Sequence, residues 1–302
     1  MRGAFIQTLC ELAAEDERIW LLTGDLGFSV LEPFIAQFPD RYLNVGVAEQ
    51  NMTGIAAGLA NCGKTVFTYS IANFPTLRCL EQIRNDVCYH KGNVKVVAVG
   101  GGFSYGAQGY THHGIEDLAI LRTLPGLTVV APGDPVETRL ATRALAAMNG
   151  PAYLRLGKAG EPLVHQAEPQ FVLGRALRLR EGKDVTLIST GGMLKKTLET
   201  ANQLAQEGLD VGVLSMHTVK PLDVEAVRQA ALHTRAIVTV EEHTLTGGLG
   251  SAVAEVLAEM PVRARLGRYA VPDCVHDEIG SQTYMMQLAG DLRQKILATL
   301  ES

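Results

Sequence analysis

Residues 127–156 read LTVVAPGDPVETRLATRALAAMNGPAYLRL, and the pattern of this stretch decides the fold class. Both of its ends are short apolar runs of the kind that form strands buried on both faces of a sheet. Between them, Asp134 is suited to cap a helix, Pro135 to the first helical position, and Gly150 to the end of the helix. Strand, helix and strand in this order predict two parallel strands joined by a crossover helix.

The same alternation extends toward the N-terminus. Apolar, β-branched runs predict strands at 19–24, 44–48, 65–69, 94–99, 127–132 and 152–156. Helix-like segments separate them at 49–63, 75–90 and 134–150. We therefore expect a mainly parallel sheet with helices on both sides, which fills a first domain of residues 1–165.

Residues 157–183 interrupt this rhythm with glycines, prolines and charges. We interpret them as an edge hairpin and a linker, and place the linker at 166–183. The alternation then restarts, with strands at 184–190, 210–216 and 236–242 and helices at 192–208, 222–232 and 248–260. The predicted class is α/β, with two doubly wound domains, the second and smaller one at 184–302.

Composition limits the function. The chain has 302 residues, of which 47% are hydrophobic and 20% charged, as in a soluble globular protein of about two domains. A net charge of −5 and an aromatic content of 6% argue against nucleic-acid binding. No apolar run is long enough to span a membrane, and acidic residues interrupt the N-terminal apolar stretch, unlike in a signal peptide. We expect a cytoplasmic protein.

The five cysteines are Cys10, Cys62, Cys79, Cys88 and Cys274. They are odd in number, scattered, and form no CxxC pair, so neither a disulfide framework nor a zinc site is expected. Reduced, mostly buried thiols are the simplest interpretation. We assign no metal ligands to this chain.

Four loops follow predicted strands at one edge of the first sheet, at 24–29, 45–51, 69–75 and 100–118. Ligands of open α/β sheets bind at this edge. Glu49 stands at the strand-to-helix junction of the second loop, where the helix dipole alone also favours a carboxylate. The apolar residues just before it instead favour a buried carboxylate that hydrogen-bonds a heterocycle.

The loop 100–114 contains six glycines and two adjacent histidines, His112 and His113. Glycines let a backbone approach a ligand closely, although a flexible surface loop with solvated histidines would have the same composition. Neighbouring histidines rarely chelate one metal ion, so ligand contact is favoured over metal binding. The sequence GGLGS at 247–251 resembles a dinucleotide loop but lacks GxGxxG, and a tight turn into the next helix is the simpler interpretation.

Several segments, taken together, resemble the C-terminal part of transketolases. In chain order they are FPDRYLNVGVAEQNMTGIAAGLA (38–60), EQIRNDV (81–87), THHGIEDLAILRTLPGLTVVAPGDPVE (111–137), YLRLGK (153–158), MHTVKPLD (216–223) and VEEHTLTGGLGSAVAEVLAE (240–259). The resemblance extends from about residue 20 to the last helix. It implies a pyrimidine-binding (Pyr) domain, followed by the transketolase C-terminal domain.

The resemblance also implies a cofactor and a partner. Family members bind thiamine diphosphate and a divalent metal through a pyrophosphate domain that carries GDG followed by Asn. This chain has only GDLG (24–27) and PGDP (132–135). It thus resembles the C-terminal subunit of a split transketolase. The N-terminal subunit would supply the ligands for Mg²⁺ or Ca²⁺, and thiamine diphosphate would lie between the two subunit types of an α2β2 assembly.

Residue roles follow from the same resemblance. Glu49 matches the family glutamate that shares a proton with N1′ of the aminopyrimidine, and is the expected catalytic acid–base group. Phe74 matches the aromatic residue that stacks on this ring. Ile71 and Leu77 fall where many relatives place further aromatics. Asp25 matches an acid near the cofactor and the subunit contact.

The substrate site implied by the resemblance comprises Gln108, His112, His113 and Lys158. His112 matches the catalytic histidine that contacts the first hydroxyls of the sugar and helps to move protons. Gln108 and Gly100, however, stand where standard transketolases have an aspartate and a histidine.

Phosphate binding departs from the family pattern too. Lys158 replaces a phosphate-binding arginine, and a lysine lacks the bidentate fork of a guanidinium. Pro33 and Pro39 occupy positions that bind sugar phosphate through Arg and Ser in the standard enzymes. We expect the acidic end of the sugar to be held differently, and a non-standard sugar is left open.

The implied reaction is transfer of a two-carbon ketol unit from a ketose donor to an aldose acceptor, by an enzyme that needs its N-terminal subunit. One alternative is the β subunit of a 2-oxo acid dehydrogenase E1 component, which shares the domain pair and the glutamate. A second alternative is deoxyxylulose phosphate synthase, but that enzyme is normally one long chain. An inactive structural subunit is the remaining alternative, although Glu49, Phe74 and His112 are retained.

Overall fold

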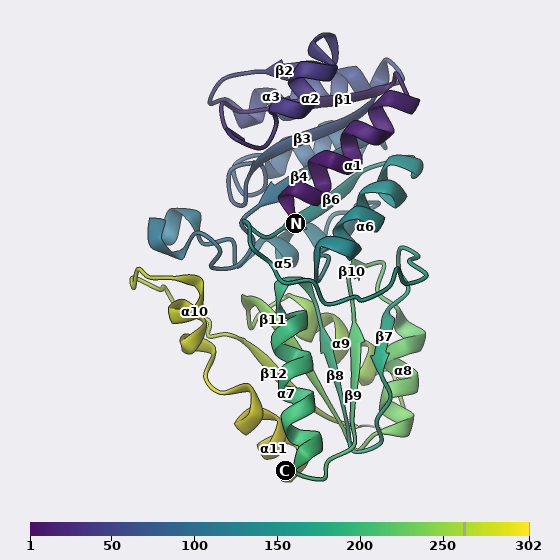
Figure 1. Cartoon of the computed structure of the whole chain (residues 1–302), viewed down its shortest axis with the longest axis vertical. Coiled ribbons are helices and arrows are strands. Elements are labelled where there is room, and N and C mark those ends of the chain that lie inside the picture. The colour runs from purple at the N-terminus through teal and green to yellow at the C-terminus, as the bar shows by residue number, and fades with distance from the viewer. Residues whose placement is uncertain (262–263, 302) are drawn as a thin grey trace.

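The computed structural model describes residues 1–261 and 264–301. Two sheets with flanking helices lie end to end along the long axis, and the N-terminus lies near their junction (Figure 1). Both sheets are α/β assemblies with helices on each face, which confirms the predicted fold class.

The first sheet contains seven strands in the order β10-β5-β6-β4-β3-β1-β2. They are β1 (Ile19–Thr23), β2 (Tyr42–Asn44), β3 (Thr65–Ile71), β4 (Val94–Val99), β5 (Thr128–Val130), β6 (Ala152–Leu156) and β10 (Thr218–Lys220). All pair in parallel except β10, which is antiparallel to β5. The carboxyl ends of β1, β3 and β4 therefore meet at one edge of the sheet.

Helices cover both faces of this sheet. They are α1 (Arg2–Glu15), α2 (Glu32–Gln37), α3 (Glu49–Asn61), α4 (Leu80–Gln82) with the π-helix Ile83–Cys88, α5 (Asp117–Arg122) and α6 (Pro135–Ala147). Short 3₁₀ turns occur at Pro39–Arg41, Gly106–Gln108 and Tyr110–His112. One core lies between the sheet and α1, α2 and α6, and the other lies on the opposite face under α3, the π-helix and α5.

The quoted stretch folds as predicted. Asp134 caps α6 by accepting a hydrogen bond from the Glu137 amide at 2.8 Å, and Pro135 occupies the first helical position. The strands β5 and β6 on either side of α6 pair in parallel. Every residue of β6 is buried, as an apolar strand in the middle of a sheet requires.

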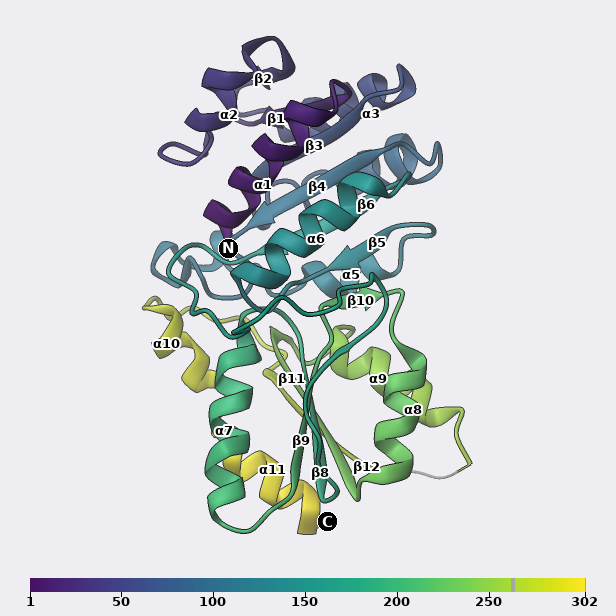
Figure 2. The same ribbon diagram turned by 45° about the vertical axis from the view of Figure 1, so that its right-hand side comes forward.

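The second sheet has the order β12-β11-β8-β9-β7. Its strands are β7 (Leu177–Arg180), β8 (Val185–Ser189), β9 (Val211–Ser215), β11 (Ala236–Thr244) and β12 (Arg265–Val271). Its helices are α7 (Leu194–Gln206), which follows the 3₁₀ turn Gly191–Met193, α8 (Val224–His233), α9 (Leu249–Ala258), α10 (Gln282–Met285) with the 3₁₀ turn Met286–Ala289, and α11 (Leu292–Glu301). Figure 2 shows α7 and α11 on one side of the sheet and α8 and α9 on the other.

Three local predictions are wrong. The strand expected at 44–48 is β2, which ends at Asn44 and is partly exposed at the sheet edge. Gly46, with a φ of 72°, lies outside the β region and so does not continue the strand. The edge hairpin expected within 157–183 is the single strand β7, which pairs antiparallel with β9. The helix expected from Pro75 begins at Leu80, after a run of turns.

The two halves are interlocked. β10 lies in the second half of the sequence but pairs with β5 of the first sheet. The buried His243, in β11, accepts a hydrogen bond at Nε2 from the Ala119 amide of α5 at 3.2 Å. GGLGS is a turn into α9, and the Glu241 carboxylate accepts hydrogen bonds from the amides of Leu249 and Gly250 at 2.7 Å.

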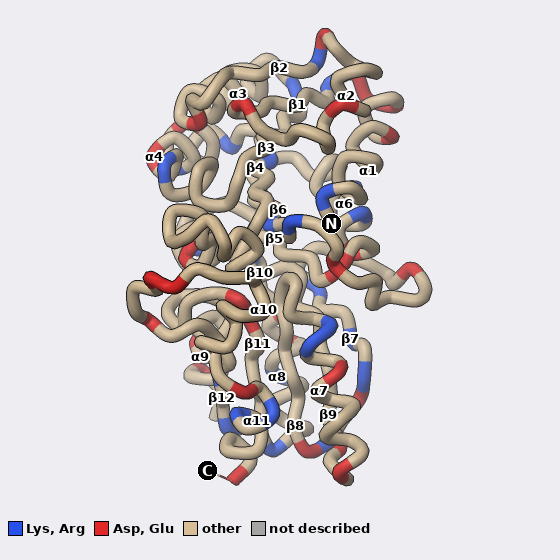
Figure 3. The backbone as a smooth tube through the Cα atoms, turned by 60° about the vertical axis from the view of Figure 1, so that its left-hand side comes forward, with Lys and Arg blue, Asp and Glu red and all other residues tan. Residues whose placement is uncertain are grey.

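Lys and Arg are interspersed with Asp and Glu along both halves of the chain (Figure 3). None of the helices in the described part of the chain has the length and apolar character that crossing a bilayer requires.

Candidate active site

Glu49 is the first residue of α3, and only 2% of it is exposed. Its Oε2 accepts a hydrogen bond from Nη1 of Arg78 at 2.6 Å. The other carboxylate oxygen lies beside Gly24, which directly follows β1, at 3.5 Å from where a Cβ on that glycine would stand. The carboxylate is therefore enclosed at the carboxyl edge of the first sheet, as the apolar flank predicted.

Arg78 links Phe74 to this carboxylate. The Arg78 guanidinium carbon is 4.7 Å from the centre of the Phe74 ring, while Nη1 bonds Glu49. The Phe74 ring also packs edge-on against the His112 ring, with centroids 5.2 Å apart. The structure thus brings together the three residues that the sequence placed in the site.

Tyr105 and Lys158 continue the row beyond His112. The Tyr105 and His112 rings are 6.3 Å apart, and Lys158 Nζ lies 4.9 Å from the centre of the Tyr105 ring. Lys158 itself is exposed. Glu49, Arg78, Phe74, His112, Tyr105 and Lys158 therefore form one continuous set of contacts, which we call the active-site row.

Asn73 fixes the loop that presents His112. Its Nδ2 donates to the carbonyl of His113 at 2.7 Å and to that of Thr111 at 3.3 Å. Within the described residues, the buried Oδ1 of Asn73 has no hydrogen-bond donor. Neither Asn73 nor Arg78 stands out in the sequence. The sequence could have indicated them only by their position, because Asn73 directly precedes Phe74 and Arg78 follows it by four residues.

His113 points away from the active-site row. It is 1% exposed, its ring packs edge-on against Phe103 at 5.0 Å, and Nε2 lies 3.3 Å from the Gly106 carbonyl oxygen. Burial lowers the pKa of this imidazole. The two adjacent histidines therefore differ: the His112 ring contacts Phe74 in the site, while the His113 ring packs beneath the loop. Its predicted substrate contact stays a prediction.

The remaining predicted residues surround the row. Asp25, at a φ of 58°, exchanges two hydrogen bonds with the Asn44 side chain, at 2.9 and 3.1 Å. Ile71 ends β3 and is half-buried, and 40% of Leu77 is exposed. Gln108 lies exposed in a 3₁₀ turn at the tip of the glycine-rich loop.

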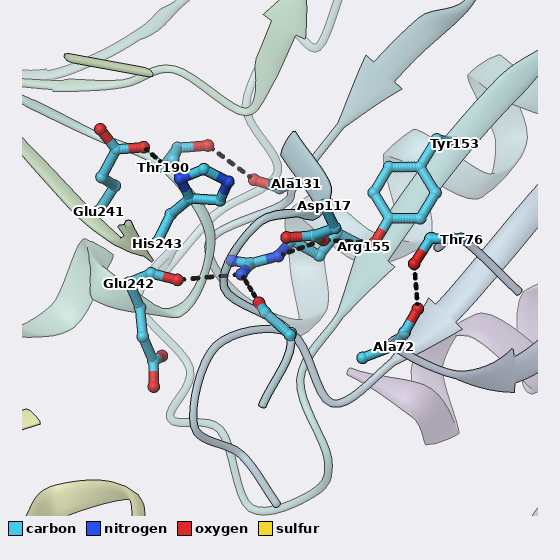
Figure 4. Close-up of polar contacts among 12 residues, drawn as sticks. Ala72, Thr76, Asp117, Ala131, Tyr153, Arg155, Thr190, Glu241, Glu242 and His243 are labelled. Atoms are coloured by element: carbon cyan, nitrogen blue, oxygen red, sulfur yellow. Dashed lines mark hydrogen bonds and ion pairs between the residues drawn. The ribbon is translucent and has the colours of Figure 1, made fainter. Parts of the chain in front are cut away.

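A buried charged centre, which the sequence did not reveal, anchors the base of that loop (Figure 4). Arg155 donates from Nε to Asp117 at 2.8 Å and from Nη2 to the carbonyls of Gly114 and Glu242 at 2.7 and 2.9 Å. Tyr153 donates to the same Asp117 oxygen at 2.5 Å. Arg155 therefore ties the loop, at Gly114, to β6 and to β11 of the second sheet.

The donor set fits an aminopyrimidine ring better than a metal ion. A buried carboxylate beside an aromatic face can hydrogen-bond a ring nitrogen while the ring stacks. Among residues 1–261 and 264–301, no group of three or more His, Cys, Asp and Glu side chains is placed to hold a metal.

Comparison with known proteins supports the same interpretation. Residues 1–160 match the family described as "Transketolase, pyrimidine binding domain", and residues 174–290 match "Transketolase, C-terminal domain". The chain belongs to the transketolase family. Both matched families were expected from the sequence resemblance, in this order along the chain.

Among transketolase relatives, the chain is 42% identical to one of the subunits of the apulose-4-phosphate transketolase of Phocaeicola vulgatus, over 90% of this chain and 87% of that one. It is 41% identical to the 6-deoxy-6-sulfo-D-fructose transketolase subunit SqwH of Clostridium sp. strain MSTE9, over 98% and 92%. A solved structure described as "Split gene transketolase, inactive beta4 tetramer" is similar, with a TM-score of 0.88 and 39% identity, over 99% and 96% of the two chains.

Proposed function

We propose that this chain is the aminopyrimidine-binding subunit of a two-chain, thiamine diphosphate-dependent transketolase. The observation that supports this most directly is the buried Glu49 carboxylate, which shares the guanidinium of Arg78 with the Phe74 ring, while that ring contacts His112. The relatives of similar length are named as transketolase subunits. The proposed reaction is transfer of a two-carbon ketol unit from a ketose to an aldose.

Glu49, Phe74, Ile71, Leu77 and Asp25 would hold the aminopyrimidine end of the cofactor. When bound, thiamine diphosphate supplies the carbon nucleophile and the electron sink needed to break a carbon–carbon bond. Glu49 holds a proton against a ring nitrogen, and its burial keeps water from competing for that hydrogen bond. Phe74 fixes the plane of the ring by stacking.

The substrate would lie over the other half of the active-site row. His112 is held between the Phe74 and Tyr105 rings, and its imidazole would exchange protons with sugar hydroxyls. Gln108 and Lys158 complete the proposed substrate group, while the buried His113 would support the loop that presents His112. Lys158 would hold the acidic end of the sugar as a point charge, which suits a phosphate or a sulfonate.

The proposed partner is an N-terminal subunit that binds the diphosphate through Mg²⁺ or Ca²⁺, in an α2β2 assembly. The apolar surface beside the row supports this. Phe28 and Val47 are each 75% exposed, and Leu43 is 38% exposed, all at the corner formed by β1, β2 and the start of α3. Large apolar side chains gathered on a surface mark an interaction site. We also propose a cytoplasmic location, which would keep the five free cysteines reduced.

The test is reconstitution. The chain is mixed with a candidate N-terminal subunit, and thiamine diphosphate binding is followed by calorimetry with the chain alone, the partner alone and the mixture. We expect tight binding only in the mixture, together with ketol transfer from a panel of phosphorylated and sulfonated ketoses. Tight cofactor binding by this chain alone would contradict the proposal that the cofactor site needs both subunits. Pyruvate decarboxylation with a lipoyl acceptor, without ketol transfer, would instead favour the E1 β-subunit alternative.

A further inference from the structure

A cavity of about 600 Å³ lies between the two halves of the chain, apart from the active-site row. It opens where β8 and β11 end: Gly191, just after β8, and Glu242, near the end of β11, line it. Residues of the first half, among them Ser104 and Arg155, form the opposite wall. β8 and β11 are neighbours in the sheet, and their following helices, α7 and α9, cover opposite faces (Figure 2). Such a switch point is where open α/β sheets bind ligands.

A helix N-terminus faces this cavity. The turn Gly191–Met193 runs directly into α7, and Gly191, Gly192 and Met193 all line the wall. The Gly191 amide donates to the carbonyl of Ala131 at 3.0 Å. The next amides, of Gly192 and Met193, open the helical segment and have no partner within it. First-turn amides and the helix dipole together favour an anion.

Arg155 adds a positive charge at the same place. It is 5% exposed, and its Nε and Nη2 are already hydrogen-bonded to Asp117, Gly114 and Glu242. Its Nη1 lies 3.6 Å from where a Cβ on Gly191 would stand and donates to no acceptor in the described part of the chain. A buried guanidinium with one unused nitrogen, directed toward a helix N-terminus, is an anion-binding arrangement.

The acidic side chains of the cavity wall are already satisfied. Both oxygens of Glu242 accept hydrogen bonds from Gln282, one accepts another from the Phe103 amide, and burial raises the pKa of this carboxyl. Glu161 and Glu199 also line the wall: Glu161 pairs with the N-terminal ammonium of Met1 at 2.5 Å, and Glu199 pairs with Lys195 at 3.6 Å. Lys196 lines the cavity, and its Nζ donates one hydrogen bond, to the Tyr269 hydroxyl at 2.7 Å. An ammonium has two further hydrogens to offer.

We propose that this cavity binds the phosphate group of a small hydroxylated metabolite, between the amides of Gly192 and Met193, Arg155 and Lys196. Ser104, Gln282, Thr283 and Gln287 line the rest of the wall and suit the hydroxyl groups of such a molecule. Ser104 precedes Tyr105, which belongs to the active-site row. A bound metabolite would therefore contact the loop that presents His112.

The sharpest test compares two substitutions that have nearly the same shape and differ in the charge they add to the cavity wall. A Cβ added at Gly192 meets nothing within 4 Å, so both Gly192→Asp and Gly192→Asn fit, and only the first adds a negative charge. The probe is glycerol 3-phosphate, titrated calorimetrically into the full chain at low salt, with glycerol as the uncharged control. We expect one saturable site in the wild type, an affinity lower by about 10-fold or more in G192D, and less than about a 3-fold change in G192N.

Two further variants locate the binding. Lys196→Met should weaken it by about 5–10-fold, whereas Lys183→Met, which alters an exposed lysine at the opposite end of β8, should not change it. Lys158→Met should leave this affinity unchanged, because Lys158 belongs to the active-site row. Equal affinities in G192D and G192N, absence of saturable binding, or loss of binding in K158M would each overturn the proposal. The measurement needs neither thiamine diphosphate nor a partner chain, so its outcome is independent of the proposed function.

Discussion

Arg78 holds the carboxylate of Glu49, with Nη1 2.6 Å from Oε2, although the two residues lie 29 positions apart in the sequence. The same guanidinium covers the Phe74 ring at 4.7 Å. Arg78 therefore occupies both contacts that the aminopyrimidine of the proposed cofactor would make. Because 46% of its side chain is exposed, it can turn into solvent without disturbing the interior.

Replacing Arg78 with methionine should tighten cofactor binding. In Arg78→Met, thiamine diphosphate no longer displaces a charge-assisted hydrogen bond worth about 1–2 kcal/mol, so its affinity for the reconstituted complex should rise by about 5–30-fold. The free chain should unfold at lower denaturant concentration, because Glu49 is left buried without a partner. Calorimetry and urea unfolding measure the two effects.

The matched control for this variant is Arg84→Met. The Arg84 side chain is exposed and, among the residues that the structure describes, hydrogen-bonds no side chain but that of its neighbour Asn85, at 2.8 Å, so neither quantity should change. A weaker affinity for thiamine diphosphate in R78M would show that Arg78 helps to hold the cofactor rather than competing with it.

Glu49→Gln tests the proposed proton transfer. The amide fills the same space but cannot share a proton with a ring nitrogen, so turnover of the reconstituted enzyme should fall at least about 100-fold. The KM for the sugar should change little, because Glu49 lies at the cofactor end of the row. Glu81→Gln, which alters an exposed carboxylate in the first turn of α4, serves as the control. Near-normal turnover in E49Q would remove Glu49 from the mechanism.

Local patterns predicted the framework of the site well. The strands at 94–99 and 152–156 have the observed limits, and Asp134 and Pro135 start α6 as expected. Such elements are specified by residues close in sequence. The sequence also predicts that Glu49, Phe74 and His112 converge, because the loops that follow parallel strands lie at one edge of the sheet.

Contacts between distant residues could not be predicted in this way. Arg78 appeared to belong to a helix from Pro75, whereas the helix begins at Leu80, and the intervening turns direct the guanidinium back to Glu49. The pairing of Arg155 with Asp117 joins residues 38 positions apart and has no local signal. β10 is a three-residue strand whose partner β5 lies in the other half of the chain.

The two adjacent histidines should respond differently to replacement. His112→Asn removes a proton-exchanging group from the row, and turnover should fall by about 10²-fold without loss of stability. His113→Asn removes a ring packed against Phe103, and should mainly lower the free energy of unfolding, by about 1–3 kcal/mol. Steady-state kinetics and urea unfolding separate these effects. Equal losses of turnover in both variants, with unchanged stability, would place His113 in the substrate site.

Burial of His113 should make the free energy of unfolding depend on pH. Burial lowers its folded-state pKa below the usual 6.5, so the unfolded chain binds more protons as the pH falls through that value. The contribution of neutral His113 is therefore fully present above pH 6.5 and is lost below it. The buried His217 acts in the same direction. Unfolding free energies at pH 7.5 and 5.5 should differ less in H113N than in the wild type, and an equal difference would contradict this assignment.

Lys158 should determine how the enzyme recognises the acidic end of its sugar. Its Nζ, 4.9 Å from the Tyr105 ring centre, is the exposed cation at the end of the active-site row, whereas exposed Lys183 lies beside the second sheet and serves as the control. Lys158→Met should raise the KM for a phosphorylated or sulfonated ketose by about 10-fold at low salt, with kcat nearly unchanged, because a remote charge contributes uniform binding. Raising the salt concentration should shrink this difference, since an exposed charge is screened. An equal change in KM for an uncharged ketose would mean that Lys158 supports the loop through Tyr105 and does not read the charge of the substrate.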